Sequence, residues 1–184
     1  MGVRCVVTGQ TTEGRSVIIR DSEVEPVRPP LLLGEPVWEF GGEDRWPQLP
    51  MTGRETFTSH GFFPPAQGGG YRFAMFSFPP TSFVPPEIDD FEAAFAETER
   101  QLPGITQAVT EREGFHITDT VDFLYILEGE VELVVGETED DNERTCLKAG
   151  DCVIQNGTHH AWHNRHPELW ATLLVVFVAA PRVS

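Results

Sequence analysis

Hydrophobic and polar positions alternate along most of the second half of the chain, and this alternation predicts short β-strands. The expected strands cover residues 106–110, 114–127, 130–136, 144–147, 151–155, 158–164 and 169–179. Turn residues separate several of them, at Glu128-Gly129, at 137–142 and at Ala149-Gly150. Nearer the start, the run YRFAMFSF from Tyr71 to Phe78 predicts another strand, which two prolines end.

A single segment, Ile88 to Leu102, shows helical rather than alternating periodicity. Phe91, Ala94, Phe95, Thr98 and Leu102 fall on one stripe, and Pro103-Gly104 ends the pattern. Many short strands with one helix predict an all-β barrel or jelly roll that carries a helical insertion. Residues 1–50 are expected to form N-terminal strands followed by a Pro-rich arm, which either covers the barrel or lies on another surface.

Length and charge narrow the class of protein. The 184 residues suit a single domain, 1–184. A formal net charge of −16 argues against nucleic acid and anionic membranes as partners. The first residues lack the pattern of a secretory signal and the three cysteines form no CxxC pair, so a cytoplasmic protein with reduced thiols is expected.

The candidate catalytic residues are chosen by the face of the strand on which they lie, because successive side chains of a strand point to opposite faces. His116, Thr118, Thr120 and Asp122 share one face, and His160 shares a face with Trp162, while His159 and His163 point away. We therefore expect His116, Asp122 and His160 to be the catalytic residues. The residues expected to contact a substrate are Thr118, Thr120, Trp162, Tyr71, Phe73 and Met75.

These two segments resemble the paired motifs of the cupin superfamily. His116, Thr118, Asp122 and Gly129 match the spacing of the first motif, HxHx(3–4)Ex(6)G. The second motif is matched by Gly150-Asp151, Gln155-Asn156-Gly157, His160 and Asn164. The resemblance implies a double-stranded β-helix, with residues 106–180 as the core barrel around one pocket, and it suggests a homodimer. The apolar, Pro-rich stretch 26–50 is the candidate for an arm exchanged between the two copies.

In that family the motif histidines and a glutamate bind a divalent metal, and by position the ligands here would be His116, Asp122 and His160. The chain departs from the pattern at Thr118, which replaces the second histidine, and at Asp122, which is shorter than glutamate. Gln155 stands where the family often has proline, and the second motif is one residue short between Gly150 and Gly157.

Three functions follow from this set. The first is an acid–base dehydratase, isomerase or lyase that acts on a small oxygenated metabolite, with secondary metabolism a plausible setting. In it, His160 takes a proton beside a carbonyl and His116 or Asp122 gives one to a leaving hydroxyl. The second is a dioxygenase, because two imidazoles and a carboxylate form a triad that suits Fe(II), with Zn(II) or Mn(II) as alternatives. The third is a non-enzymatic barrel that binds a small molecule.

Overall fold

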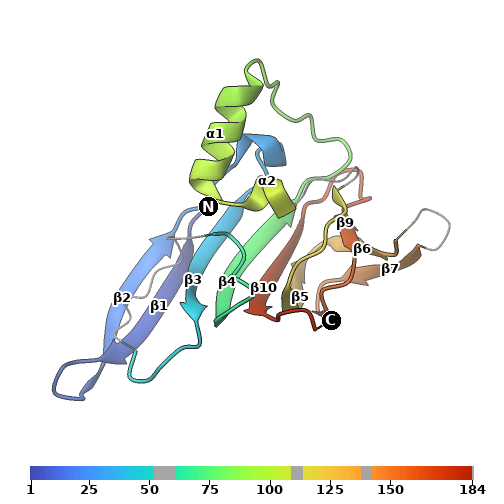
Figure 1. Cartoon of the computed structure of the whole chain (residues 1–184). Helices are drawn as coiled ribbons and strands as arrows, with labels where there is room; N and C mark the ends of the chain where they lie inside the picture. The colour runs from blue at the N-terminus through green and yellow to red at the C-terminus, as the bar shows by residue number, and fades with distance from the viewer. Residues whose placement is uncertain (52–60, 109–113, 138–141, 184) are drawn as a thin grey trace.

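The protein is mostly β-structure. The computed structural model describes residues 1–51, 61–108, 114–137 and 142–183 (Figure 1). Its strands are β1 (Val3–Gln10), β2 (Ser16–Val24), β3 (Val37–Arg45), β4 (Gly69–Phe78), β5 (Thr120–Glu128), β6 (Glu130–Val135), β7 (Glu143–Lys148), β8 (Cys152–Gln155), β9 (His160–His163) and β10 (Ala171–Ala179). The helical elements are η1 (Pro30–Leu32), α1 (Phe91–Gln101) and α2 (Ile105–Ala108).

Two antiparallel sheets enclose the core. The larger has the order β3-β4-β10-β5-β8, and the smaller has the order β7-β6-β9. One hydrophobic cluster joins them, since Leu124 and Leu173 of the larger sheet pack in the same cluster as Val131 of the smaller one. This is the double-stranded β-helix, so the predicted all-β fold class is confirmed. The hairpin β1-β2 forms a separate two-stranded sheet that extends to one side (Figure 1).

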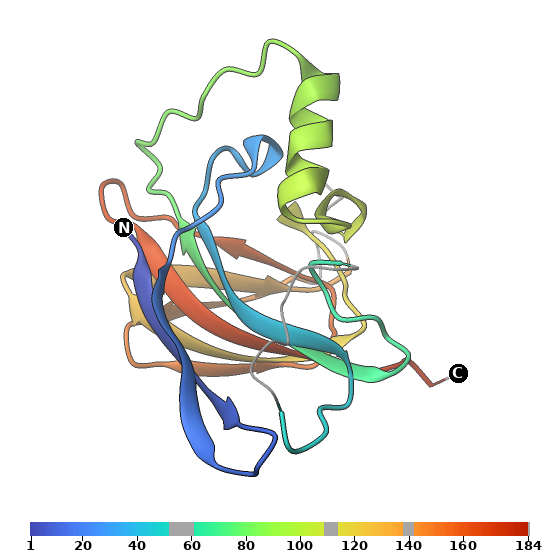
Figure 2. The same ribbon diagram turned by 90° about the vertical axis from the view of Figure 1, so that its left-hand side faces the viewer.

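The helical elements gather at one end of the barrel. In Figure 2, α1 and η1 lie next to each other above the strands, and the hydroxyl of buried Thr98 in α1 accepts a hydrogen bond from the Leu31 amide of η1, 3.0 Å away. Helix α1 begins after the N-cap Asp90, whose side chain accepts a hydrogen bond from the Ala93 amide. The predicted helix is therefore present but begins three residues later than Ile88.

The strand expected over 106–110 is wrong for its described part, which is helical as α2. Gly104 has φ +83°, a conformation that glycine adopts readily, and the chain turns sharply there after α1. After this turn, Ile105 packs in the hydrophobic core. Residues 109 and 110 lie outside the described residues. No described helix is long and apolar enough to cross a membrane.

The Pro-rich segment packs on its own barrel. Its second half is β3, which pairs with β4 so that Trp38 lies opposite Met75. Its first half forms η1, which contacts α1 through Leu31. Exchange of this segment between two copies, and the homodimer itself, stay predictions.

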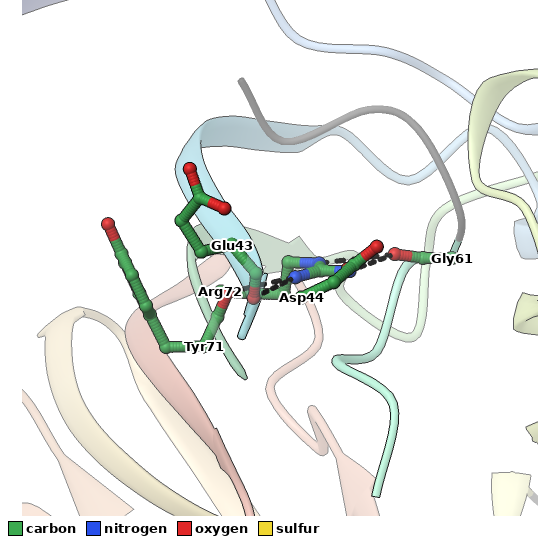
Figure 3. A network of polar contacts seen from close by, with 5 residues as sticks. All are labelled: Glu43, Asp44, Gly61, Tyr71 and Arg72. Carbon is green, nitrogen blue, oxygen red and sulfur yellow. Dashed lines mark hydrogen bonds and ion pairs between the residues drawn. The ribbon is translucent and has the colours of Figure 1, made fainter. Parts of the chain in front are cut away.

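Arg72 ties β3, β4 and the segment at Gly61 together (Figure 3). The side chain is only 1% exposed, and its guanidinium donates to the carbonyl oxygens of Gly61, Glu43 and Tyr71. It also forms an ion pair with Asp44. Because so many of its donors are occupied by the protein, Arg72 serves the structure of this corner of the sheet.

Candidate functional site

A cavity of about 700 Å³ lies inside the barrel. Both sheets contribute to its wall, with Val175 from β10 and Trp162 from β9, and η1 closes one side with Leu31 and Leu32. Most of the lining side chains are aliphatic or aromatic. The polar ones are Glu35, His116, Asp122, His160, His163 and Arg165. A cavity of this kind binds a mostly apolar small molecule and orients it with a few polar groups.

His116 and His160 meet at the cavity wall. Their backbones form an isolated antiparallel bridge, in which each amide donates to the other's carbonyl at 2.9 and 3.0 Å. The imidazole ring centroids are 4.3 Å apart. Nδ1 of His116 lies 2.8 Å from the Gly114 carbonyl oxygen, and because a carbonyl only accepts, this nitrogen carries the proton.

His160 is neutral in the folded protein. The residue is 2% exposed, and burial lowers its pKa to about 3, with a smaller contribution from the neighbouring His116. The Trp162 ring stands edge-on against it, with 5.9 Å between the ring centroids. A neutral imidazole with so low a pKa is a poor proton acceptor and a good hydrogen-bonding group for a substrate oxygen.

Asp122 supplies the carboxylate of the site from β5. It is 4% exposed, and Oδ1 has no hydrogen-bond partner. Burial raises the pKa of this carboxyl to about 6, although a hydrogen bond with the Thr120 hydroxyl lowers it in part. A buried oxygen without a partner is costly, and here it borders the cavity, where a ligand can reach it.

Thr118 and Thr120 form a pair of hydroxyl groups close to Asp122. Both are buried, and their hydroxyl oxygens are 2.8 Å apart. Neither belongs to the cavity wall, so the structure does not bring them to the position expected of substrate contacts. Thr120 instead forms a hydrogen bond with Asp122, and Thr118 forms one with Thr120.

The cavity has a second polar end, to which Glu35 contributes. On β10, Phe177 is paired with Asp122 of β5. Four residues away on β10, Leu173 is paired with Phe76 of β4, and Phe76 is paired in turn with Val37 of β3. At about 3.3 Å per residue, these two levels of β10 are roughly 13 Å apart. Glu35 precedes Val37 and therefore lies near the end remote from Asp122.

Glu35 has no counterpart among the predicted site residues. Burial raises the pKa of its carboxyl to about 7. Its place in the Pro-rich segment gave no signal, since a Glu between Gly34 and Pro36 is typical of an exposed turn. Only the packing of η1 over the barrel brings it to the cavity wall.

Trp162 lines the cavity, as the alternation predicted, but Tyr71, Phe73 and Met75 do not. Phe73 and Met75 belong to a second cluster with Trp38 and Phe40, on the other face of the sheet. On β4 the residues that reach the cavity are Phe76 and Phe78. The sequence predicted a strand here correctly but assigned the wrong face to the pocket, because both faces are apolar.

The comparison with protein families agrees with this geometry. Residues 106–177 match the family model described as "Cupin domain". This chain contains a cupin domain. The match spans both motif histidines and the strands β5 to β9, so the cupin motifs and the cavity wall belong to the same part of the chain.

Curated relatives of this cupin come from fungi. The chain is 35% identical over 89 residues to phomopsin biosynthesis cluster protein D of Diaporthe leptostromiformis, covering 45% of this chain and 45% of the relative. It is 38% identical over 69 residues to oryzines biosynthesis cluster protein J of Aspergillus oryzae, covering 38% of this chain and 36% of the relative. The matched region thus spans less than half the length of each relative.

Solved structures match this chain only at low identity and with low TM-scores. A putative ethanolamine utilization protein Q from Salmonella typhimurium is 10% identical with a TM-score of 0.42, and 98% of each chain is covered. An RmlC-like cupin from Methanocaldococcus jannaschii is 14% identical with a TM-score of 0.36, over 59% of this chain and 70% of that chain. Overlaps of this size bear on neither substrate nor reaction.

The cupin metal motif is incomplete here. Within residues 1–51, 61–108, 114–137 and 142–183, no group of three or more His, Cys, Asp or Glu side chains could hold a metal ion. His116, Asp122 and His160 border one cavity without forming such a group, and Thr118 holds the place of a further histidine. The described donor set therefore does not fit the metal site that the resemblance implied.

Proposed function

We propose that this cupin is an acid–base enzyme that moves a proton beside a carbonyl group of an elongated, mostly apolar metabolite. The observation that carries the proposal is Asp122, a buried carboxylate with an unpartnered oxygen on the wall of an apolar cavity. Because burial raises its pKa to about 6, Asp122 is ionised at neutral pH and still a stronger base than an ordinary aspartate.

His160 has a different role from the one its sequence position suggested. Its pKa of about 3 makes it a weak base, so proton abstraction falls to Asp122. The neutral imidazole hydrogen-bonds the substrate's carbonyl oxygen and stabilises the enolate that forms there. His116, whose ring is 4.3 Å away, holds the position of His160 through their backbone bridge.

The proton balance is complete without another reactant. Asp122 takes a proton from the carbon next to the carbonyl, and the C–H electron pair becomes the enolate. If the neighbouring carbon bears a hydroxyl, the C–O bond then breaks, the proton on Asp122 passes to the leaving hydroxyl, and water and a conjugated double bond result. If that carbon belongs to a double bond, the proton returns to the far carbon and the double bond migrates.

The shape of the cavity supports an elongated substrate. The levels of β10 in register with Asp122 and with the start of β3, which follows Glu35, are roughly 13 Å apart. The wall of the cavity also includes apolar side chains such as Leu124 and Val175. The relatives are named for phomopsin and oryzines biosynthesis clusters, which supports a substrate from a biosynthetic pathway of small metabolites.

The test uses a panel of linear ketones, β-hydroxy ketones and enones of eight to twelve carbons as probes. The chelator-treated protein is incubated with each probe in D2O, and mass spectrometry follows deuterium uptake, loss of water and double-bond migration. We expect at least one probe to react, and Asp122→Asn to lower its rate about 10²–10⁴-fold. Exposed Asp89→Asn is the matched control.

Three outcomes contradict the proposal. In the first, a probe reacts equally fast with the Asp122→Asn variant. In the second, reaction requires added Fe(II) and consumes oxygen, which supports the dioxygenase alternative. Retention of full activity by His160→Ala would contradict the role of the imidazole.

A further inference from the structure

Gln155 is the residue that stands where the cupin motif often has proline, and its amide forms a clamp on Thr158. Oε1 accepts hydrogen bonds from the Thr158 amide at 3.1 Å and from the Thr158 hydroxyl at 3.1 Å. Nε2 donates to the Thr158 carbonyl at 3.0 Å. The side chain is 3% exposed, so water does not compete for these bonds.

The clamp leaves only one orientation for the amide. If the oxygen and nitrogen were exchanged, the NH2 group would face the Thr158 N–H, and the amide oxygen would face the Thr158 carbonyl. One contact would then place two donors together and the other would place two acceptors together. In a buried place such unmade hydrogen bonds are costly. Nε2 of Gln155 is therefore the atom that faces His160.

This orientation has a consequence for His160. Nε2 of Gln155 lies 2.5 Å from Nδ1 of His160. Two N–H donors cannot lie this close, so Nδ1 accepts the hydrogen bond through its lone pair. The Thr158 carbonyl, 2.9 Å from the same Nδ1, could also accept a proton from it, but a second N–H at this nitrogen would clash with the NH2 group of Gln155. In a neutral imidazole the single proton then resides on Nε2.

We propose that Gln155 is a positioning residue that holds His160 as the Nε2–H tautomer, so that the imidazole presents a proton, and not a lone pair, to the cavity. His116 is held the opposite way, because its Nδ1 donates to the Gly114 carbonyl. The two adjacent rings thus carry their protons on different nitrogens, Nε2 in His160 and Nδ1 in His116. The consequence for catalysis rests on the proposed function, whereas the tautomer can be measured without a substrate.

This arrangement explains why a glutamine suits this position. A metal ligand requires a lone pair on the coordinating nitrogen, which a carbonyl or carboxylate secures by accepting the proton of the other nitrogen. An amide NH2 at that second nitrogen does the reverse. Gln155 therefore favours a hydrogen bond to a substrate oxygen over metal coordination at His160.

The experiment is long-range proton–nitrogen NMR on the full chain labelled with 15N-histidine, at neutral pH and without added ligand. His160→Gln identifies the His160 signals by their loss. We expect a protonated Nε2 and an unprotonated Nδ1 for His160 in the wild type. Gln155→Glu and Gln155→Leu should move the proton to Nδ1, because the Thr158 carbonyl then accepts it. Exposed Gln107→Glu is the matched control and should leave the tautomer unchanged.

A protonated Nδ1 in the wild type overturns the proposal, and so does an unchanged tautomer in both folded Gln155 variants, with folding checked by circular dichroism. If both variants fail to fold, the wild-type spectrum decides alone. Failure here is distinguishable from failure of the proposed function, because the deuterium assay tests Asp122 whichever nitrogen of His160 carries the proton.

Discussion

The imidazole rings of His116 and His160 lie 4.3 Å apart, and the two residues pair through their backbones across the barrel wall. They come from segments that are far apart in the sequence, one before β5 and one at the start of β9. The contact also affects charge, because His116 contributes to the lowered pKa of His160. At neutral pH the wall of the cavity therefore holds a neutral His160 and the Asp122 carboxylate.

The first prediction concerns the pH dependence of catalysis. Because burial raises the pKa of Asp122 to about 6, activity should rise with pH and level off above that value. The measurement is kcat/KM against pH for a reacting probe. The wild type should show an ascending limb with a midpoint near pH 6, and the residual activity of Asp122→Asn should lack it. An ascending limb near pH 4 would contradict the role of a desolvated base.

The second prediction concerns stability at the same residue. The folded pKa of Asp122 is raised from 3.8 to about 6, so the unfolded chain loses its proton first and stability falls as pH rises through this window. Asp122→Asn should therefore increase the free energy of unfolding at pH 7.5 by about 1–3 kcal/mol. Below pH 4 the difference should vanish. Chemical denaturation at both pH values measures it, with Asp89→Asn as the exposed control.

The third prediction concerns Glu35 at the remote end of the cavity. Burial raises the pKa of this carboxyl from 4.5 to about 7, so its ionisation weakens the fold as pH rises through that range. Glu35→Gln should be more stable than the wild type at pH 8.5 and equally stable at pH 4. Denaturation curves at the two pH values test this. An equal gain from the exposed Glu13→Gln would show that net charge, and not burial, is the cause.

The fourth prediction concerns Arg72. Replacing it with methionine leaves Asp44 without its buried cation and several carbonyl oxygens without a donor. The free energy of unfolding should fall by about 3–5 kcal/mol. The control is Arg4→Met, since the Arg4–Asp21 pair is exposed and should matter little. A loss of stability no larger for Arg72→Met than for Arg4→Met would contradict this assignment.

Much of the fold could be predicted from the sequence. Alternating polarity placed β6 to β10 within two residues of their observed bounds, because a half-buried strand needs an apolar side chain at every second position. The strand predicted from residue 114 begins only at Thr120, and before it His116 forms no more than an isolated bridge with His160. The same parity put His116, Asp122 and Trp162 on the cavity side. It failed for β4, where both faces are apolar, so that Phe73 and Met75 were assigned to the pocket and Phe76 was not.

The sequence by itself determined the barrel, its motif residues and the apolar character of the pocket, since these depend on local periodicity and spacing. Only the tertiary structure decided how each group behaves. The burial that raises the pKa of Asp122, the turn that brings Glu35 to the cavity, and the Gln155 amide against His160 depend on contacts between segments distant in the chain. Desolvation and hydrogen-bond direction are properties of those contacts, and no pattern along a single strand encodes them.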